Sequence, residues 1–167
     1  MTQINKLKNF NWHIKKLEEG SINRIAAGEV IERPAAAVKE LVENAIDSTA
    51  TSIMISISHG GKSFIKVVDN GWGIRKEELM LALTSHATSK IDKDDLLNIT
   101  TLGFRGEALS SIAAVSKVNL KSKAEDASEA AEIKSHAGNF EKIKPVALLS
   151  GTSVEVHDLF YATPARL

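Results

Sequence analysis

The chain has 167 residues, of which 43% are hydrophobic and 25% charged, which fits one soluble globular domain and excludes disorder as a global description. Its 21 Lys and Arg residues balance 21 Asp and Glu residues, so net charge cannot attract nucleic acid and any such contact needs a local patch. The absence of cysteine excludes disulfides, thiolate metal sites and a cysteine nucleophile.

The N-terminal segment is basic and lacks the continuous apolar core of a secretory signal. No acidic residue precedes Glu18, and apolar residues recur at helical spacing: Leu7, Phe10, Ile14 and Leu17. We expect residues 1–13 to be an arm or extension, either a frayed terminus that partly covers the domain or an arm that binds a partner. No stretch approaches the roughly 20 apolar residues of a membrane span, so we expect a cytoplasmic protein without membrane contact.

A helix is expected from Pro34 to about Asp47. Proline suits the first helical position, and one stripe of this helix is apolar: Val38, Leu41, Val42, Ala45 and Ile46. The opposite face gathers oxygen-bearing side chains within a narrow arc: Glu40, Glu43, Asn44 and Asp47. This arc contains no basic residue for pairing, so it is either a solvated acidic face or a source of ligands for a hard cation such as Mg²⁺.

A hairpin follows the helix. Alternating isoleucines and a second β-rich run predict a strand at 53–57, a turn at 59–61 and a strand at 64–68. Asp69 then begins an Asp-x-Gly-x-Gly loop, and a helix is expected from about Lys76 to Leu83. Asp69 either caps an ordinary turn or accepts a hydrogen bond from the amine of a flat ligand that the two glycines allow to approach.

The rest of the chain mixes helices and strands. After an aperiodic stretch at 86–92, the pattern predicts a short helix at 94–99, a buried helix at 108–115, a strand around 118–120, a helix at 124–131 and a strand at 152–156. This mixture favours the α+β class over a regular parallel α/β repeat.

Two irregular segments could bind phosphate. Residues 103–106 (Gly-Phe-Arg-Gly) lead into a helix, whose N-terminal amides attract anions, so they form either a phosphate loop or an ordinary glycine-rich helix entry. Residues 88–90 (Thr-Ser-Lys) form either a lid over phosphates or a polar loop. Neither the Walker motif nor the dinucleotide-binding glycine motif occurs in the chain.

Taken together in chain order, these segments resemble the MutL family of DNA mismatch-repair ATPases. This family is part of the superfamily of type II topoisomerases, the large heat-shock chaperone and sensor histidine kinases. The resemblance covers residues 14–167 and rests on residues 25–34, 39–44, 69–74, 86–90, 102–109, 151–152 and 158–166. It implies that residues 14–167 are an ATP-binding domain with a two-layer α/β sandwich of the Bergerat type, in which a mixed, mostly antiparallel sheet has helices on one face.

The resemblance also implies roles for individual residues. Glu40 corresponds to the general base that activates the attacking water, Asn44 to the magnesium ligand, and Asp69 to the reader of the adenine amine. The other implied binding residues are Gly71, Gly73 and Ile74 at the adenine, Thr88, Ser89 and Lys90 in the lid, Leu102, Gly103, Phe104, Arg105, Gly106, Glu107, Ala108 and Leu109 in the phosphate loop, and Thr152 beside Asp69.

The implied function is Mg²⁺-dependent ATP binding and hydrolysis that couples mismatch recognition to downstream repair. In the family, ATP-bound domains of two chains associate, and the partners are DNA, mismatch-recognition proteins and downstream repair proteins. The family continues into a second subdomain that supplies a lysine to the γ-phosphate, so we expect this chain to bind ATP but to hydrolyse it slowly or not at all unaided. A nucleotide-gated interaction module without turnover, or a folded remnant that binds nothing, remains open.

One short segment departs from the family pattern. Ser48 and Thr49 stand where the family usually has Ala-Gly, so the sequence leaves open whether the helix from Pro34 ends in a left-handed cap.

Overall fold

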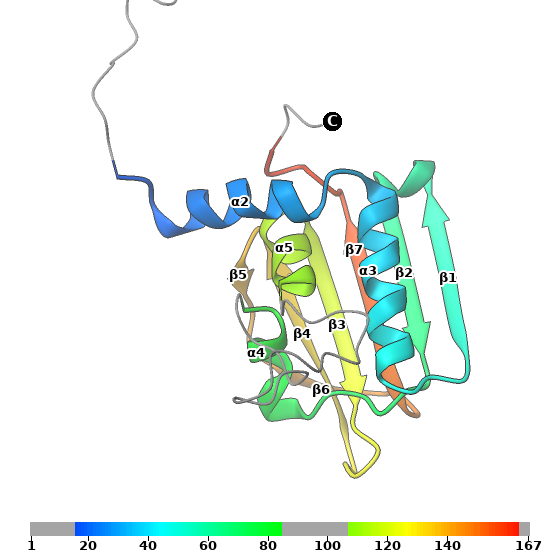
Figure 1. Cartoon of the computed structure of the whole chain (residues 1–167). Coiled ribbons are helices and arrows are strands. Elements are labelled where there is room, and N and C mark those ends of the chain that lie inside the picture. Colours follow the sequence, from blue (N-terminus) through cyan, green and yellow to red (C-terminus); the bar gives the residue numbers. More distant parts are fainter. Residues whose placement is uncertain (1–15, 85–106, 164–167) are drawn as a thin grey trace, which may run out of the picture.

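The computed structural model describes residues 16–84 and 107–163, which form an antiparallel sheet with helices on one face (Figure 1). The strands are β1 (Ile53–Ser58), β2 (Phe64–Asp69), β3 (Lys117–Lys123), β4 (Ala130–His136), β5 (Asn139–Phe140), β6 (Lys144–Val146) and β7 (Gly151–His157). Their order is β1-β2-β7-β3-β4-β5, and β6 also pairs with β4. Every pairing among these strands is antiparallel, and the expected α+β class is confirmed.

The helices form a second layer in front of the sheet. They are α2 (Glu19–Val30), α3 (Pro34–Asp47), α4 (Leu79–Ala82) and α5 (Ala108–Val115), with short 3-10 turns η1 (His59–Gly61) and η2 (Lys76–Glu78). Helix α3 packs on β2, α5 packs on β3 and β4, and α2 crosses one end and packs against α5 (Figure 1). Among the described residues, no helix has the length and apolar character needed to cross a bilayer.

The core lies between the two layers, because side chains alternate between the faces of each strand. Ile65 and Val67 of β2 are buried on the helix side, and Val156 and Val154 of β7 stand opposite them. Asp69 follows Val67 by two residues and therefore points to the same side. An acidic side chain thus stands at a position where the strand pattern places apolar ones.

Most expected elements are confirmed by these bounds. The matches are 34–47 as α3, 53–57 and 64–68 as β1 and β2, 76–83 as η2 followed by α4, 108–115 as α5, 118–120 within β3, and 152–156 within β7. The expected arm at 1–13, the stretch at 86–92 and the short helix at 94–99 lie outside the described residues.

The helix expected at 124–131 is wrong. Ala124 is the first residue of a turn, and its carbonyl accepts the N–H of Ala127 at 3.0 Å. Strand β4 then begins at Ala130. Alanine and glutamate favour a helix locally, but Ile133 of β4 pairs with Leu120 of β3 and is fully buried. Ladder hydrogen bonds and apolar burial therefore outweigh the local preference.

Helix α2 and the short strands β5 and β6 are not expected from the sequence. Gly20 and Gly28 lower the helix propensity of α2 by about 1 kcal/mol each relative to alanine. The helix forms in spite of them because it packs along α5, where Ala27 is buried.

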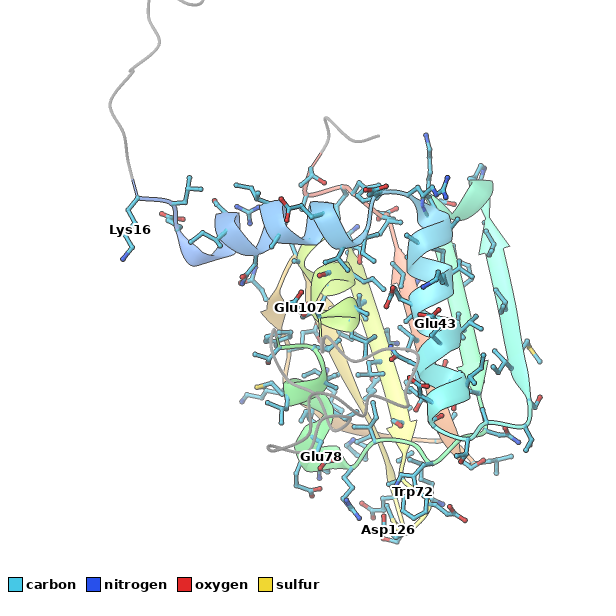
Figure 2. The ribbon with its side chains drawn as sticks, viewed as in Figure 1. Lys16, Glu43, Trp72, Glu78, Glu107 and Asp126 are labelled. Atoms are coloured by element: carbon cyan, nitrogen blue, oxygen red, sulfur yellow. The ribbon has the colours of Figure 1, made fainter. Side chains whose placement is uncertain are left out.

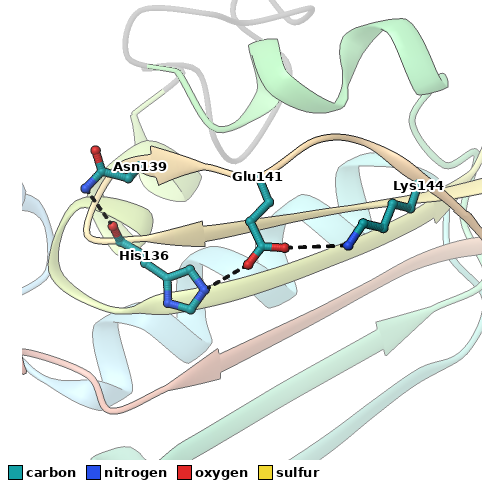
Figure 3. Close-up of polar contacts among 4 residues, drawn as sticks. All are labelled: His136, Asn139, Glu141 and Lys144. Carbon is teal, nitrogen blue, oxygen red and sulfur yellow. Dashed lines mark hydrogen bonds and ion pairs between the residues drawn. The ribbon is translucent and has the colours of Figure 1, made fainter.

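The two edges of the sheet differ in charge. At one edge, β4 pairs with the very short strands β5 and β6. Figure 3 shows the polar cluster beside them, where Glu141 lies 3.3 Å from Nε2 of His136 and 3.9 Å from Nζ of Lys144, while Asn139 donates to the His136 carbonyl at 3.2 Å. Short strands and charges protect an edge from further pairing. Strand β1, at the other edge, contains no charged residue.

Helix α3 ends in a Schellman motif with a threonine at the left-handed position. The N–H of Ala50 bonds to the Ala45 carbonyl at 3.1 Å, and the N–H of Thr49 bonds to the Ile46 carbonyl at 2.9 Å. Thr49 has a φ of 62°, a conformation that strains a β-branched residue by roughly 1–2 kcal/mol. The left-handed cap is therefore present although Thr49 stands where glycine is usual.

We expect Thr49→Gly to raise the free energy of unfolding by about 0.5–1 kcal/mol. The strain energy that glycine removes from the folded state exceeds the conformational entropy that it adds to the unfolded chain, in free-energy terms. Thr49→Ala is the matched control, since it also removes the hydroxyl contact with the Ser48 carbonyl but keeps a Cβ. Urea unfolding followed by circular dichroism measures both variants. Equal gains in the two, or a loss in the glycine variant, would contradict the proposed strain.

Candidate functional site

A buried carboxylate lies at the end of β2. Asp69 is 9% exposed; the Gly71 N–H donates to its Oδ1 at 2.9 Å, and the N–H of Thr152, directly opposite on β7, also donates to the carboxylate. Burial raises the pKa of Asp69 above its ordinary value of 3.8, and the two N–H donors oppose that rise. A carboxylate has about four lone-pair positions, so acceptor capacity remains for a ligand.

The glycines of the loop are required by packing within the protein. A Cβ on Gly71 would overlap Oγ of Ser48 and lie 2.7 Å from the Ser48 carbonyl oxygen. Gly73 has a φ of 77°, and a Cβ there would overlap the carbonyl oxygen of Lys123. These contacts hold the loop between the end of α3 and the end of β3. The expectation is that both glycines allow a ligand to approach. Close packing within the protein is a second reason why these two positions need glycine.

Polar contacts also fix the loop to its neighbours. Oδ1 of Asn70 accepts the N–H of Thr51 at 2.9 Å and that of the following residue at 2.8 Å. Arg75 forms an ion pair at 2.6 Å with Asp126, in the turn between β3 and β4. Figure 2 shows Trp72 and Asp126 together beyond this end of the sheet. The loop is thus tied both to the segment after α3 and to the β3–β4 turn.

Ser122 joins the loop to β7 and is a site residue that is not predicted from the sequence. This residue of β3 is 2% exposed; its Oγ accepts the Ile74 N–H at 2.7 Å and lies 2.9 Å from both the Gly151 carbonyl oxygen and Oγ1 of Thr152. No motif marks this serine, because its contacts depend on the register that places it opposite Thr152.

The predicted base and metal ligand lie on the polar face of α3. Glu40 and Asn44 are both half-buried, and the Glu40 side chain is 27% exposed. Lys39 lies 2.8 Å from Glu43 and 3.8 Å from Glu40, and its hydrogen bond with Glu43 raises the pKa of Lys39. The arc of oxygen-bearing side chains contains no basic residue, but Lys39 lies beside this arc and pairs with Glu43. The prediction that this face has no basic partner is therefore wrong.

Helix α3 carries these residues toward the glycine loop. Its C-cap residue, Ser48, accepts the Trp72 N–H at 2.9 Å, so the helix ends against the loop. Asn44 is one turn earlier, because its carbonyl accepts the Ser48 N–H at 3.0 Å, and Glu40 is a further turn away. Figure 2 marks Glu43 midway along the helix, between these two positions in the chain. The structure therefore brings Glu40 and Asn44 to the side of the sheet where Asp69 is buried.

Helix α5 provides the start of the predicted phosphate site. Glu107 precedes it, and the Ser111 N–H bonds to the Glu107 carbonyl at 2.9 Å. Ala108 is half-buried and Leu109 packs against the core. Helix α5 also contacts α3. The other predicted lid and phosphate residues lie outside the described residues: Thr88, Ser89, Lys90, Leu102, Gly103, Phe104, Arg105 and Gly106.

The donor set is compatible with magnesium shared with phosphate. Across residues 16–84 and 107–163, no three His, Cys, Asp or Glu side chains come together to hold a metal ion. Mg²⁺ bound together with substrate phosphates needs only one or two protein oxygens, a number that the Asn44 side chain can meet. A hollow of about 700 Å³, lined by Lys123, residues 128–130 and residues 145–149, contains none of the predicted site residues.

Sequence comparison finds matches over most of the chain. A family profile described as "Histidine kinase-, DNA gyrase B-, and HSP90-like ATPase" matches residues 31–162. Over 154 residues, the chain is 60% identical to DNA mismatch repair protein MutL of Bartonella bacilliformis and 54% identical to that of Rickettsia rickettsii. Each match covers 92% of this chain but 25% of the relative, so the chain spans about a quarter of the length of these relatives.

Solved structures show the same similarity. The Aquifex aeolicus MutL ATPase domain complexed with ADP matches with a TM-score of 0.66 and 37% identity, covering 82% of this chain and 47% of that one. A crystal structure described as the N-terminal domain of a DNA repair protein matches with a TM-score of 0.71 and 34% identity, covering 87% of this chain and 41% of that one.

The raised pKa of Asp69 predicts how stability depends on pH. Because its folded-state pKa exceeds the unfolded value, its stabilising contribution is complete below about pH 3.8 and is lost as pH rises through the folded-state pKa. We therefore expect Asp69→Asn to melt at or above the wild-type temperature at pH 7, and the difference to shift in favour of the wild type on acidification.

Asp126→Asn is the control with the opposite sign, because the hydrogen bond from Arg75 lowers the pKa of Asp126. That variant should melt at or below the wild-type temperature at pH 7. Thermal melts of the three proteins between pH 4 and pH 7 provide the measurement. A wild type that is clearly more stable than Asp69→Asn at pH 7 would contradict the argument.

Proposed function

Because the chain belongs to the family of histidine kinase-, DNA gyrase B- and HSP90-like ATPases, we propose that it binds and hydrolyses Mg-ATP as the ATPase domain of a MutL-type mismatch-repair protein. The observation that carries this proposal is the Asp69 carboxylate. It is buried at the end of β2, is held by two backbone N–H groups and keeps acceptor capacity for a ligand. A buried acceptor of this kind suits an amine of a flat heterocycle.

Adenine recognition is the proposed role of Asp69. The exocyclic amine of adenine would donate to the carboxylate, and hydrogen bonds to an ionised acceptor are roughly twice as strong as neutral ones. Ile74 follows the loop, packs against the core and would supply apolar contact to the ring. Thr152 supports the carboxylate from the neighbouring strand through its backbone N–H.

Hydrolysis is the proposed role of the polar face of α3. Glu40 would accept a proton from the attacking water, and Asn44 would bind Mg²⁺ one turn later on the same helix. When bound, Mg²⁺ neutralises phosphate charge and orients the γ-phosphate for in-line attack. A single helix fixes the separation of the proton acceptor and the metal ligand, which is the positional accuracy such a reaction needs.

Phosphate binding is the proposed role of the segment that enters α5. The first amides of a helix lack partners within the helix and carry partial positive charge, so they favour the ATP phosphates. Residues 102–109 would contribute these amides, and residues 88–90 would close over the nucleotide as a lid. The support for both segments is the resemblance of their sequence to the MutL family.

The wider biological role is also part of this proposal. The relatives named DNA mismatch repair protein MutL support a place in mismatch repair, and a cytoplasmic location is part of the same proposal. The whole protein would contact DNA, a mismatch-recognition protein and downstream repair proteins. Two ATP-bound copies would associate, and ATP hydrolysis would allow them to separate.

We expect Mg-ATP binding to weaken by about 1.5–3 kcal/mol in Asp69→Asn, which is roughly a ten- to 150-fold rise in Kd. The loss of a charged acceptor for the adenine amine is the cause. Asp158→Asn is the matched control, since it removes an exposed carboxylate that pairs with Lys117 at the opposite end of the sheet. Isothermal titration measures all three proteins, and equal affinity in wild type and Asp69→Asn would refute adenine recognition by Asp69.

We expect Glu40→Gln to abolish release of inorganic phosphate while leaving Mg-ATP affinity nearly unchanged, because the amide cannot accept the proton of water. Glu43→Gln is the matched control on the same face, since the Glu43 carboxylate pairs with Lys39. If the wild type releases no phosphate but two copies still associate on ATP addition, the chain is a nucleotide-gated interaction module. Turnover that persists in Glu40→Gln would remove Glu40 from the proposed mechanism.

A further inference from the structure

Ser122 has more hydrogen-bonding neighbours than its single proton can serve as a donor. Its buried Oγ lies 2.7 Å from the Ile74 N, 2.9 Å from the Gly151 carbonyl oxygen and 2.9 Å from Oγ1 of Thr152. The Ile74 N–H can only donate, and the Gly151 carbonyl can only accept. The hydroxyl of Ser122 therefore donates its proton to Gly151.

The contact between the two hydroxyls then has only one possible direction. Ser122 has already given its proton to Gly151, so the hydrogen bond with Thr152 forms only if Thr152 donates. The proton of Thr152 is thereby directed toward β3. Its Oγ1 presents lone pairs alone on the side that faces away from Ser122.

Thr152 and Asp69 are directly opposite residues of β7 and β2, so their side chains stand on the same face of the sheet. Side chains paired in this way have Cβ atoms about 4.5–5.5 Å apart. A ligand group bound to the Asp69 carboxylate would therefore lie near Oγ1 of Thr152 as well, within reach directly or through one water. Both protein groups present acceptors.

We infer that Ser122 is a positioning residue that makes this site selective for 6-aminopurine over 6-oxopurine nucleotides, by holding the hydroxyl of Thr152 as an acceptor. The inference rests on the proposed nucleotide-binding function. An amino group at C6 supplies donors to two acceptors, whereas a carbonyl oxygen at C6 places a third acceptor against them. Without Ser122, the Thr152 hydroxyl can rotate and donate, which lowers the penalty for the oxo group.

The test compares Mg-ATP with Mg-ITP, because inosine carries the 6-oxo group and lacks the 2-amino group that would complicate guanine. Isothermal titration of the whole chain gives the ratio Kd(ITP)/Kd(ATP). We expect Ser122→Ala to lower this ratio about tenfold, the worth of one hydrogen bond of ordinary strength. Ser122→Cys replaces the hydroxyl with a slightly larger thiol that hydrogen-bonds only weakly, and should lower the ratio in the same direction.

Ser116→Ala is the structural control. Ser116 is equally buried, donates to the Ile112 carbonyl at 2.6 Å and lies next to the opposite end of β3. Both alanine variants lose a buried hydrogen bond and should melt earlier than the wild type. Only Ser122→Ala should change the ratio, so a general loss of stability is separated from an effect on selectivity.

A double-mutant cycle with Thr152→Val tests the route of the effect. The valine removes the hydroxyl and should itself lower the ratio, after which Ser122→Ala should produce no further change. If the wild type prefers ATP and the ratio is unchanged in the folded serine variants, or if the two effects add, the inference fails while the proposed function stands. If the wild type binds neither nucleotide, the proposed function fails and the inference with it.

Discussion

The candidate site is arranged around one carboxylate that is buried at the end of a central strand. The alternation of β2 places Asp69 in the row of Ile65 and Val67, on the side of the sheet that the helices cover. Burial without partners would disfavour the charge strongly. The Gly71 and Thr152 N–H groups offset part of that penalty, and the surrounding backbone is arranged so that both can reach the carboxylate. The tight loop, the left-handed glycine and the contact with α3 all serve this arrangement.

The sequence predicts those parts of the fold that depend on local pattern. The apolar stripe and leading proline of α3 specify its bounds, and alternating side chains specify β1 and β7. The Asp-x-Gly-x-Gly spacing also locates Asp69 at the end of a strand, since glycine is needed where the backbone has a positive φ, as at Gly73. Pattern therefore identifies the candidate site as a place in the chain.

Other features depend on register and packing, which local pattern does not contain. Ser122 acquires its three polar neighbours only because β3 pairs with β7 in one particular alignment. The segment before β4 has a helical composition, yet Ile133 is buried by pairing with Leu120 of β3. The close contacts of Gly71 with Ser48 and of Gly73 with Lys123 form only when the strands and α3 pack together, so they cannot be predicted from the sequence. These details decide how the carboxylate is held, so the chemistry of the site is less predictable than its position.

The strand order has a consequence for biosynthesis. Within residues 16–84 and 107–163, strand β7 comes last in the chain but lies between β2 and β3, and it supplies the residue opposite Asp69. During synthesis on the ribosome, α3 and the β1–β2 hairpin are therefore made before β7. The edge of β2 that pairs with β7 stays unpaired until the chain has been made as far as His157. Such non-local pairing slows folding and leaves an unpaired edge open in the meantime. Chaperone demand during translation should therefore concentrate on the interval before the last central strand is added.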